Sequence, residues 1–388
     1  MPGETRHSLW RLVSEGRPLG GLGPAGRVLA SYAGGIRDAS FDTEMGSNNR
    51  TGSEAMKLVQ KIVMLGLSAA IVFAVGVTPM SQQAAAWEPK KPVEFVIMAG
   101  QGGGADRLAR FIQSIIEKNN LSPKPFVAIN KKGGSGAEAL VYMKEHKGDP
   151  HVILATLNSY YTTPLRQPNL DVDIGNFTPI TKMADDTFQL WVHSDTDIKS
   201  VEQYVAAVKA AGAANWKMGG TGAGQEDSLV TAMLEAKFGI KVTYIPYSGG
   251  GTVAKELIGK HINSTVNNPS EQVGFWDAGQ SRPLASFTPK GKVAGKFGSI
   301  PTFEELGYGN DMVYYMQRSI IAPEGIDADV QAFYVDVFEK VYNSEEWQSY
   351  MSGKGLIPGW LTGDALTEYF LEGREVHRAL LKKTGEIN

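Results

Sequence analysis

The stretch Met98-Ala99-Gly100-Gln101-Gly102-Gly103-Gly104-Ala105-Asp106-Arg107-Leu108-Ala109-Arg110 decides the fold, because it joins a β-type run (residues 93–97) to a helical pattern through three consecutive glycines. Glycine lets a backbone approach a ligand closely. The first N–H groups of the helix have no acceptors within it and lie at the positive end of its dipole. Such a junction can bind a carboxylate or a phosphate without arginine or lysine.

The residues after this junction predict a helix that packs on a sheet. The apolar positions of one helical stripe are Leu108, Phe111, Ile112, Ile115 and Ile116. β-type runs and amphipathic helices then alternate, which predicts an α/β fold with mostly parallel sheets. The helices predicted at 328–343, 345–352 and 367–383 have no sheet of their own, so we expect them to return to the first sheet.

Four polar or glycine-rich loops follow predicted strands, at residues 100–106, 157–161, 219–225 and 247–251. Ligands in open α/β sheets bind beyond the carboxyl ends of the strands. A second unit that starts near Ser200 repeats the order of strand, glycine loop and helix. If two lobes face each other, these loops line the cleft between them.

The region before Trp87 predicts export. A basic segment (56–61), an uncharged apolar run (62–77) and the cleavage site Ala84-Ala85-Ala86 follow one another as in a secretory signal peptide. The apolar run is shorter than the ~20 residues of a membrane span. We therefore predict a signal peptide at 56–86 and a periplasmic location, with an uncleaved anchor as the alternative.

Residues 1–55 precede this signal, which should itself stand at the N-terminus. The simplest interpretation is a start assigned too early, with Met56 as the initiator. A disordered cytoplasmic extension is the alternative, because the segment is rich in Gly, Ser and Arg and has little apolar periodicity. We leave it out of the fold prediction.

The composition excludes several function classes. Apolar residues make up 42% and charged residues 20% of the chain, as in ordinary soluble proteins. The net charge of −3 offers no broad basic surface, so we predict no nucleic-acid partner and no polybasic lipid anchor. The absence of cysteine excludes disulfides, thiolate metal sites and a cysteine nucleophile.

Motifs for catalysis are missing as well. The six histidines have no metal-binding spacing, and no G-x-S-x-G or phosphate-loop motif occurs. The 220–225 loop lacks the last glycine of G-x-G-x-x-G. We predict no catalytic residue, no metal and no cofactor.

Two local interpretations stay open at this stage. A lone glycine loop is more often a tight turn than a ligand site. Asp106 can cap the helix or contact a ligand, and we favour the cap because a carboxylate would repel an anion. Aromatic residues near the predicted cleft are mostly packing residues, although one or two could form an apolar wall.

Several motifs together resemble a known family. They are Gly102-Gly103-Gly104-Ala105-Asp106, Gly133-Gly134-Ser135-Gly136, Gly222-Ala223-Gly224, Ile245-Pro246-Tyr247-Ser248-Gly249-Gly250, Ile300-Pro301-Thr302-Phe303-Glu304-Glu305-Leu306-Gly307 and Ile321-Ala322-Pro323-Glu324-Gly325. In order and spacing this set resembles the Bug proteins, extracytoplasmic substrate-binding subunits of tripartite tricarboxylate transporters.

The resemblance implies a two-lobed periplasmic-binding-protein fold of type II, in which each lobe is a mixed, mostly parallel sheet flanked by helices and the ligand cleft lies between the lobes. It divides the chain into lobe 1 (87–190 plus 314–388) and lobe 2 (191–313). The hinge would lie near 189–193 and 313–320. The implied partners are a small carboxylate ligand and integral-membrane permease subunits, and we expect a monomer.

The resemblance also implies a ligand site. It places around the ligand Gly102, Gly103, Gly104, Ala105, Asp106, Asn158, Ser159, Thr221, Gly222, Ala223, Gly224 and Tyr247. We add Tyr160 from the second loop and Asn267, which follows a predicted strand. None of the four loops contains lysine or arginine, but Arg166 or Arg318 could reach the cleft.

This chain departs from the family pattern at a few positions. Met98, Gly100 and Gln101 replace the usual prolines, and Asn263 replaces a common aspartate. The ligand therefore remains open among di- or tricarboxylates, aromatic acids and amino acids. The alternative function is a carboxylate-sensing receptor for a membrane sensor kinase, and an enzyme of the same fold ranks third.

Overall fold

The computed structural model describes residues 87–388, which form one compact unit built on two mixed sheets. The predictions for residues 1–55 and 56–86 lie outside the described residues. The first sheet has the order β11-β4-β10-β3-β1-β2. Its strands are β1 (Val93–Ile97), β2 (Phe126–Asn130), β3 (Val152–Thr156), β4 (Thr178–Asp186), β10 (Met316–Ala322) and β11 (Ile357–Leu361).

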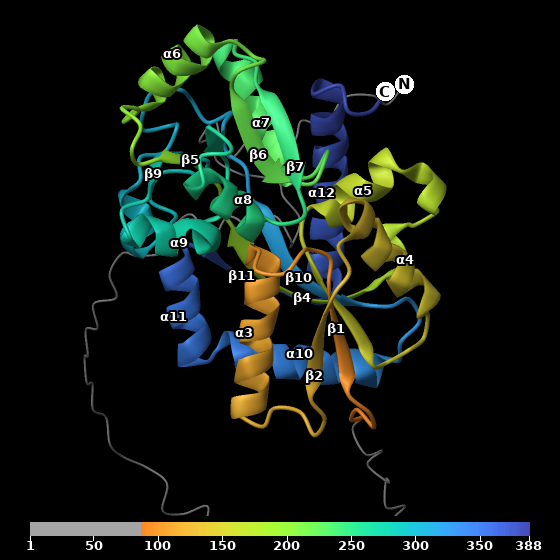
Figure 1. The fold of residues 1–388 in the computed structure, drawn as a ribbon. Helices are drawn as coiled ribbons and strands as arrows, with labels where there is room; N and C mark the ends of the chain where they lie inside the picture. The colour runs from red at the N-terminus through yellow and green to blue at the C-terminus, as the bar shows by residue number, and fades with distance from the viewer. Residues whose placement is uncertain (1–86) are drawn as a thin grey trace, which may run out of the picture. The chain divides into compact units, whose positions relative to one another are not determined.

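The second sheet has the order β7-β6-β8-β5-β9. Its strands are β5 (Gln189–His193), β6 (Lys217–Thr221), β7 (Thr243–Tyr247), β8 (Ser264–Thr265) and β9 (Ser281–Ser286). We call the first sheet with its helices the first lobe and the second sheet with its helices the second lobe (Figure 1).

Parallel pairing is confined to the part of each sheet where strands and helices alternate. β1 pairs in parallel with β2 and β3, and β6 with β7 and β8. The strands next to the crossings between lobes pair antiparallel: β10 with β3 and β4, and β5 with β8 and β9. The two-lobed α/β prediction is confirmed, with more antiparallel pairing than a β-α-β pattern alone indicates.

Helices cover the first sheet in two groups (Figure 1). One group is α3 (Gly104–Lys118), α10 (Ala328–Tyr342) and α11 (Glu345–Lys354); the other is α4 (Ala137–Glu145), α5 (Ser159–Arg166) and α12 (Gly363–Lys383). The predicted α3 stripe is confirmed, because Leu108, Ile112, Ile115 and Ile116 are buried and Phe111 stacks on Tyr350. The predicted return of the C-terminal helices is confirmed for α10 and α12, which contact β4.

The second lobe is smaller. Its helices are α6 (Val201–Ala211), α7 (Glu226–Phe238), α8 (Gly250–Ile258) and α9 (Pro269–Asp277), and short 3-10 turns complete the chain at Gly133–Gly136, Pro168–Leu170, Ile174–Asn176 and Gly295–Ser299. Trp191, Val253 and Leu257 form part of a separate apolar cluster under α8. α9 contacts α3 and α11, and so joins the lobes.

The chain crosses between the lobes twice. It leaves the first sheet through Thr187 and Phe188, between β4 and β5, and returns through residues 287–315, between β9 and β10. The crossings lie side by side, because Phe287 N donates to Phe188 O and Tyr314 N donates to Phe287 O, each at 2.9 Å. The predicted hinge borders these crossings and stays a prediction.

Candidate functional site

The first glycine loop is held in place by Asp106. Its carboxylate accepts from Gly102 N, from Arg110 Nε and from Asn130 Nδ2, each at 2.9 Å. Gly102 has a φ of 76°, a left-handed conformation that favours glycine. Asp106 therefore fixes the loop, as we expected, but the predicted helix cap is wrong, because the amide from which Asp106 accepts, Gly102 N, lies before the helix.

The N-terminus of α3 is occupied by a carboxylate of the other lobe. Gly104 N donates to Glu271 Oε1 at 2.9 Å. The second oxygen, Oε2, accepts from Asn267 Nδ2 at 2.7 Å and from Asn268 N at 3.1 Å, the latter as part of a capping box that starts α9. Glu271 thus joins the two lobes at the anion site that the sequence predicts.

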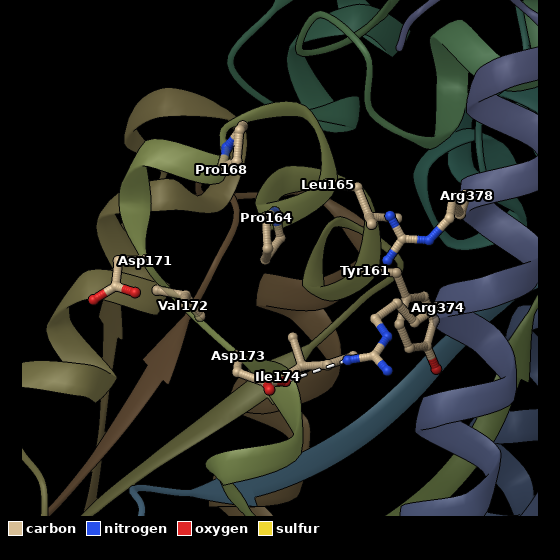
Figure 2. Close-up of a pocket in the computed structure, with 10 residues that line it drawn as sticks. All are labelled: Tyr161, Pro164, Leu165, Pro168, Asp171, Val172, Asp173, Ile174, Arg374 and Arg378. Carbon is tan, nitrogen blue, oxygen red and sulfur yellow. Dashed lines mark hydrogen bonds and ion pairs between the residues drawn. The ribbon is translucent and has the colours of Figure 1, made fainter. Parts of the chain in front are cut away.

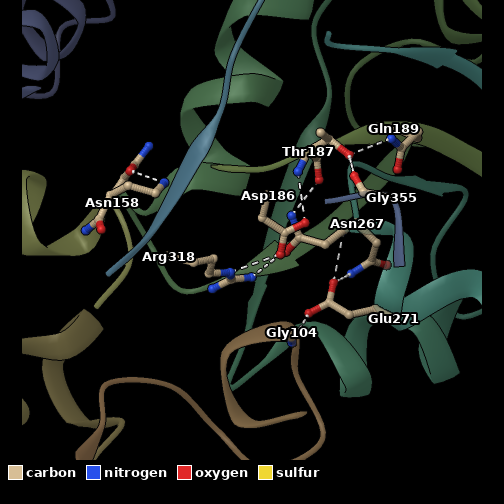
Figure 3. Close-up of polar contacts among 11 residues, drawn as sticks. Gly104, Asn158, Asp186, Thr187, Gln189, Asn267, Glu271, Arg318 and Gly355 are labelled. Atoms are coloured by element: carbon tan, nitrogen blue, oxygen red, sulfur yellow. Dashed lines mark hydrogen bonds and ion pairs between the residues drawn. The ribbon is translucent and has the colours of Figure 1, made fainter. Parts of the chain in front are cut away.

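A buried ion pair lies beside this contact (Figure 3). Arg318, on β10, donates through Nε to Asp186 Oδ2 at 3.0 Å and also through Nη2. Both side chains are only 2% exposed. Thr187 N donates to the other Asp186 oxygen at 2.8 Å. Burial raises the pKa of Asp186 even though the guanidinium opposes that rise.

One nitrogen of the Arg318 guanidinium takes no part in this ion pair. Its Nη1 has no hydrogen-bond partner within residues 87–388, and neither has the hydroxyl of Ser270 at the start of α9. Both side chains border Gly104: a Cβ placed there would lie 2.6 Å from Arg318 Nη2 and 3.3 Å from Ser270 Oγ. A buried donor without an acceptor is costly, so this spot is suited to an anion.

A second set of contacts between the lobes resembles the contact of Glu271 with the start of α3. Ser159 N, at the start of α5, donates to Glu226 Oε1, and Gln225 Nε2 donates to Ser159 Oγ at 2.8 Å. Asp227, next along α7, accepts from Thr221 N at 2.7 Å. Burial raises the pKa of Glu226 and of Asp227, as it does for Glu271.

The glycine loops of the two lobes approach backbone to backbone. A Cβ on Gly100 would lie 2.2 Å from Ser248 O, and a Cβ on Gly251 would lie 2.5 Å from Gly102 O. Any side chain larger than hydrogen would push these loops apart. The lobes are therefore in direct contact.

The predicted site residues divide into three groups. Gly102, Gly103, Gly104, Ala105 and Asp106 surround the start of α3, and Asn267 contacts both Glu271 and Gly250 O. Ser159 meets Glu226, while Thr221, Gly222, Ala223 and Gly224 form a loop whose Ala223 O accepts from Ser135 Oγ and Arg166 Nη1. Asn158, Tyr160 and Tyr247 engage other partners.

Those three side chains use their polar groups within their own lobe or, for Asn158, also on the crossing that enters it. The Asn158 amide bonds to Gln317 N, Tyr315 O and Tyr314 OH. The Tyr160 hydroxyl donates to Ile174 O at 2.8 Å in the first-lobe core, and the Tyr247 hydroxyl contacts Glu256 at 3.5 Å. Their role as ligand contacts stays a prediction.

Of the two arginines considered from the sequence, Arg318 lies inside the interface. Arg166 lies at its edge, with Nη1 donating to Ala223 O at 2.8 Å and Nη2 paired with Glu386 at 3.2 Å.

Sequence reasoning missed the acidic residues Asp186, Glu226, Asp227 and Glu271. A signal existed for Glu271, because Asn268-Pro269-Ser270-Glu271 is a helix-start pattern with a capping box. Glu226 and Asp227 stand in the first turn after a glycine loop, where carboxylates usually serve the helix dipole. The contact of Glu226 with Ser159 of the first lobe has no sequence signal.

Two surface cavities lie away from this interface. One, of about 360 Å³, lies between α5 and α12 (Figure 2) and contains the Arg374–Asp173 ion pair, whose Nη1 and Oδ1 are 3.3 Å apart. The other, of about 750 Å³, lies between α7 and the end of α12. Neither includes a residue of the predicted site.

Within residues 87–388 no cluster of three His, Cys, Asp or Glu side chains is arranged to hold a metal ion. The helices described there are too short or too polar to cross a membrane. His377 is buried between Gly373 O and Tyr314 OH, and burial lowers its pKa to about 4.

Solved structures show which fold this is, the two-lobed fold of periplasmic binding proteins. The periplasmic binding protein BugD matches with a TM-score of 0.71 and 21% identity over 76% of this chain and 98% of that one. An R. palustris protein with adipate matches with a TM-score of 0.68 and 22% identity over 76% of this chain and 98% of that one.

The sequence narrows this class to one family. The model of the tripartite tricarboxylate transporter family receptor matches residues 108–383. A Cupriavidus necator protein, described as the UPF0065 protein in the gbd 5′ region, is 25% identical over 84% of this chain and 97% of its own length. The chain belongs to the tripartite tricarboxylate transporter receptor family, so the family resemblance is confirmed.

Proposed function

We propose that this chain is a periplasmic solute-binding protein that captures a small organic carboxylate between its lobes for a tripartite tricarboxylate-type permease. The observation that carries the proposal is the buried, unpartnered Nη1 of Arg318 beside the N-terminus of α3. A guanidinium nitrogen and a helix N-terminus both favour an anion, and a carboxylate suits the fork of an arginine.

The ligand would bind by closure of the lobes and without chemistry. Two crossings join the lobes, and Gly104 and Ser159 of the first lobe face Glu271 and Glu226 of the second, which is the arrangement that hinge closure needs. The adipate of the R. palustris neighbour supports a carboxylate as the ligand class. The family match supports delivery of the ligand to a permease.

A thermal-shift screen against a panel of mono-, di- and tricarboxylates tests this function, followed by calorimetry on the ligands that raise the unfolding temperature. Arg318→Gln should abolish binding of those ligands, because it removes the free donor. The matched control is Arg378→Gln, which changes an arginine in the surface cavity of Figure 2. Unchanged affinity in Arg318→Gln, or no ligand in the whole panel, would contradict the proposal.

A further inference from the structure

The interface holds more buried acid than base. Asp186, Glu226, Asp227 and Glu271 are between 1% and 6% exposed. Arg318 is the guanidinium that faces them, and Asp186 already pairs with it. The remaining three carboxyls have backbone amides, hydroxyls and side-chain amides as partners but no cation. A buried carboxylate without a counter-charge is unfavourable.

Two of these carboxyls take the positions where a ligand carboxylate would bind. Glu271 accepts from Gly104 N at the start of α3, and Glu226 accepts from Ser159 N at the start of α5. A ligand carboxylate is therefore left with Arg318 Nη1 and the hydroxyl of Ser270, both of which lack partners.

The carboxyls also lie within electrostatic reach of one another. Glu271 and Glu226 raise the pKa of Asp227, although burial is the larger cause. Arg318 acts on Glu226 and on Glu271 in the opposite direction. Glu226 and Glu271 thus lie within electrostatic reach both of Asp227 and of the Arg318 guanidinium.

We propose that the ligand of this site is a small monocarboxylate that carries an ammonium group, bound with its carboxylate on Arg318 and its ammonium towards Glu226, Asp227 and Glu271. This inference rests on the proposed function and narrows it. A dicarboxylate would bring its second charge next to three carboxyls, and like charges in an interface cost several kcal/mol. An ammonium group supplies the missing cation.

Calorimetry on ligands of matched length tests the inference. The series is pentanoate, 4-aminobutyrate and glutarate, which differ only in an uncharged, positive or negative end; butyrate against 2-aminobutyrate covers the α-position. We expect the ammonium member of a series to bind at least about tenfold more tightly than its neutral and its dianionic counterparts.

Glu271→Gln and Glu226→Gln identify the side chains responsible. Each keeps the size of the residue but removes a charge, so each should reduce the affinity of the ammonium ligand relative to that of the neutral monocarboxylate, and this ratio is the readout. The control is Glu346→Gln, which neutralises a surface carboxyl paired with Lys118 at 2.7 Å and should leave the preference unchanged. Thermal melts of the variants verify that they fold.

Different results of these experiments test the ammonium preference and the proposed carboxylate-binding function separately. Tightest binding of glutarate, or an ammonium preference that survives both glutamine variants, would overturn the inference and leave a carboxylate-binding protein. Tighter binding of a simple amine than of the matched amino acid would overturn it too. Absence of binding by every carboxylate would overturn the proposed function as well.

Discussion

The two faces of the interface carry opposite chemistry. The first lobe presents donors: Gly104 N, Ser159 N and the Arg318 guanidinium. The second lobe presents the acceptors Glu226 and Glu271. The lobes are therefore complementary to each other before any ligand is considered. A ligand has to match the polar groups that the contacts between the lobes leave without partners. The contrast between donors on the first lobe and carboxyls on the second therefore determines the charge of the ligand more than the glycine loops do.

Removal of the central donor should have the largest effect on stability. Arg318→Ala leaves Asp186 buried without its partner, which should lower the free energy of unfolding by about 3–5 kcal/mol. Urea denaturation measures this loss.

The double variant Asp186→Asn/Arg318→Gln distinguishes charge from packing. It removes both charges, so it should recover a large part of the lost stability and still fail to bind carboxylates. If Arg318→Ala alone is as stable as the parent protein, the stability of the first lobe does not depend on the Arg318–Asp186 ion pair.

The buried His377 of the first lobe and the buried carboxyls of the second lobe should also respond to pH in opposite directions. Burial lowers the pKa of His377 in the first lobe to about 4, so the stability that its neutral form contributes is present above its unfolded pKa of about 6.5 and is lost as the pH falls towards 4. This loss amounts to about 3 kcal/mol. The raised pKa values of Glu226, Asp227 and Glu271 act with the opposite sign, since they reduce stability as the pH rises above about 4.

Urea denaturation from pH 4 to pH 7.5 measures both trends. His377→Gln should remove the loss on acidification, and Glu271→Gln should reduce the loss at rising pH. His146→Gln is a control at a histidine outside the buried core. Identical pH profiles for the His377 variant and the parent protein would contradict the assignment.

A substitution where the glycine loops of the two lobes approach each other should have a smaller effect, and this effect should be on ligand affinity. Gly251→Ala places a Cβ 2.5 Å from Gly102 O and keeps the lobes apart, so we expect affinity to fall by about tenfold and the small-angle scattering profile with ligand to stay expanded. Alanine suits the α8 helix, so the fold should remain stable. In Gly249→Ala the nearest atom is 3.5 Å away, and closure should be normal. Equal ligand affinities in Gly251→Ala and Gly249→Ala would contradict the close approach of Gly251 to Gly102 O in the ligand-bound protein.

Much of the fold could be predicted from the sequence, because it depends on local patterns. The α3 stripe, the glycine loops after β1, β6 and β7, and the three C-terminal helices are all properties of short segments. α5 was missed because it is only 8 residues long and contains Pro164 and two threonines, which are poor helix formers. β11 was missed because Pro358 and Gly359 are unusual in a strand.

The site could be predicted only in part. The start of α3 as an anion site and Arg318 as a reachable cation were expected, and the structure brings them together. Gly104 and Glu271 are 167 positions apart and meet only where the lobes pack, and Arg318 and Asp186 are 132 apart and meet through the pairing of β10 with β4 in the first sheet. No pattern within one segment indicates that the protein supplies its own carboxylates to the helix termini.

A crystal structure with a carboxylate from the thermal-shift screen tests the central claim most directly. The account predicts a ligand carboxylate oxygen within about 3 Å of Arg318 Nη1, enclosed between α3 and α9. A ligand that binds in the surface cavity between α5 and α12, or between the lobes without contact to Arg318, would contradict it.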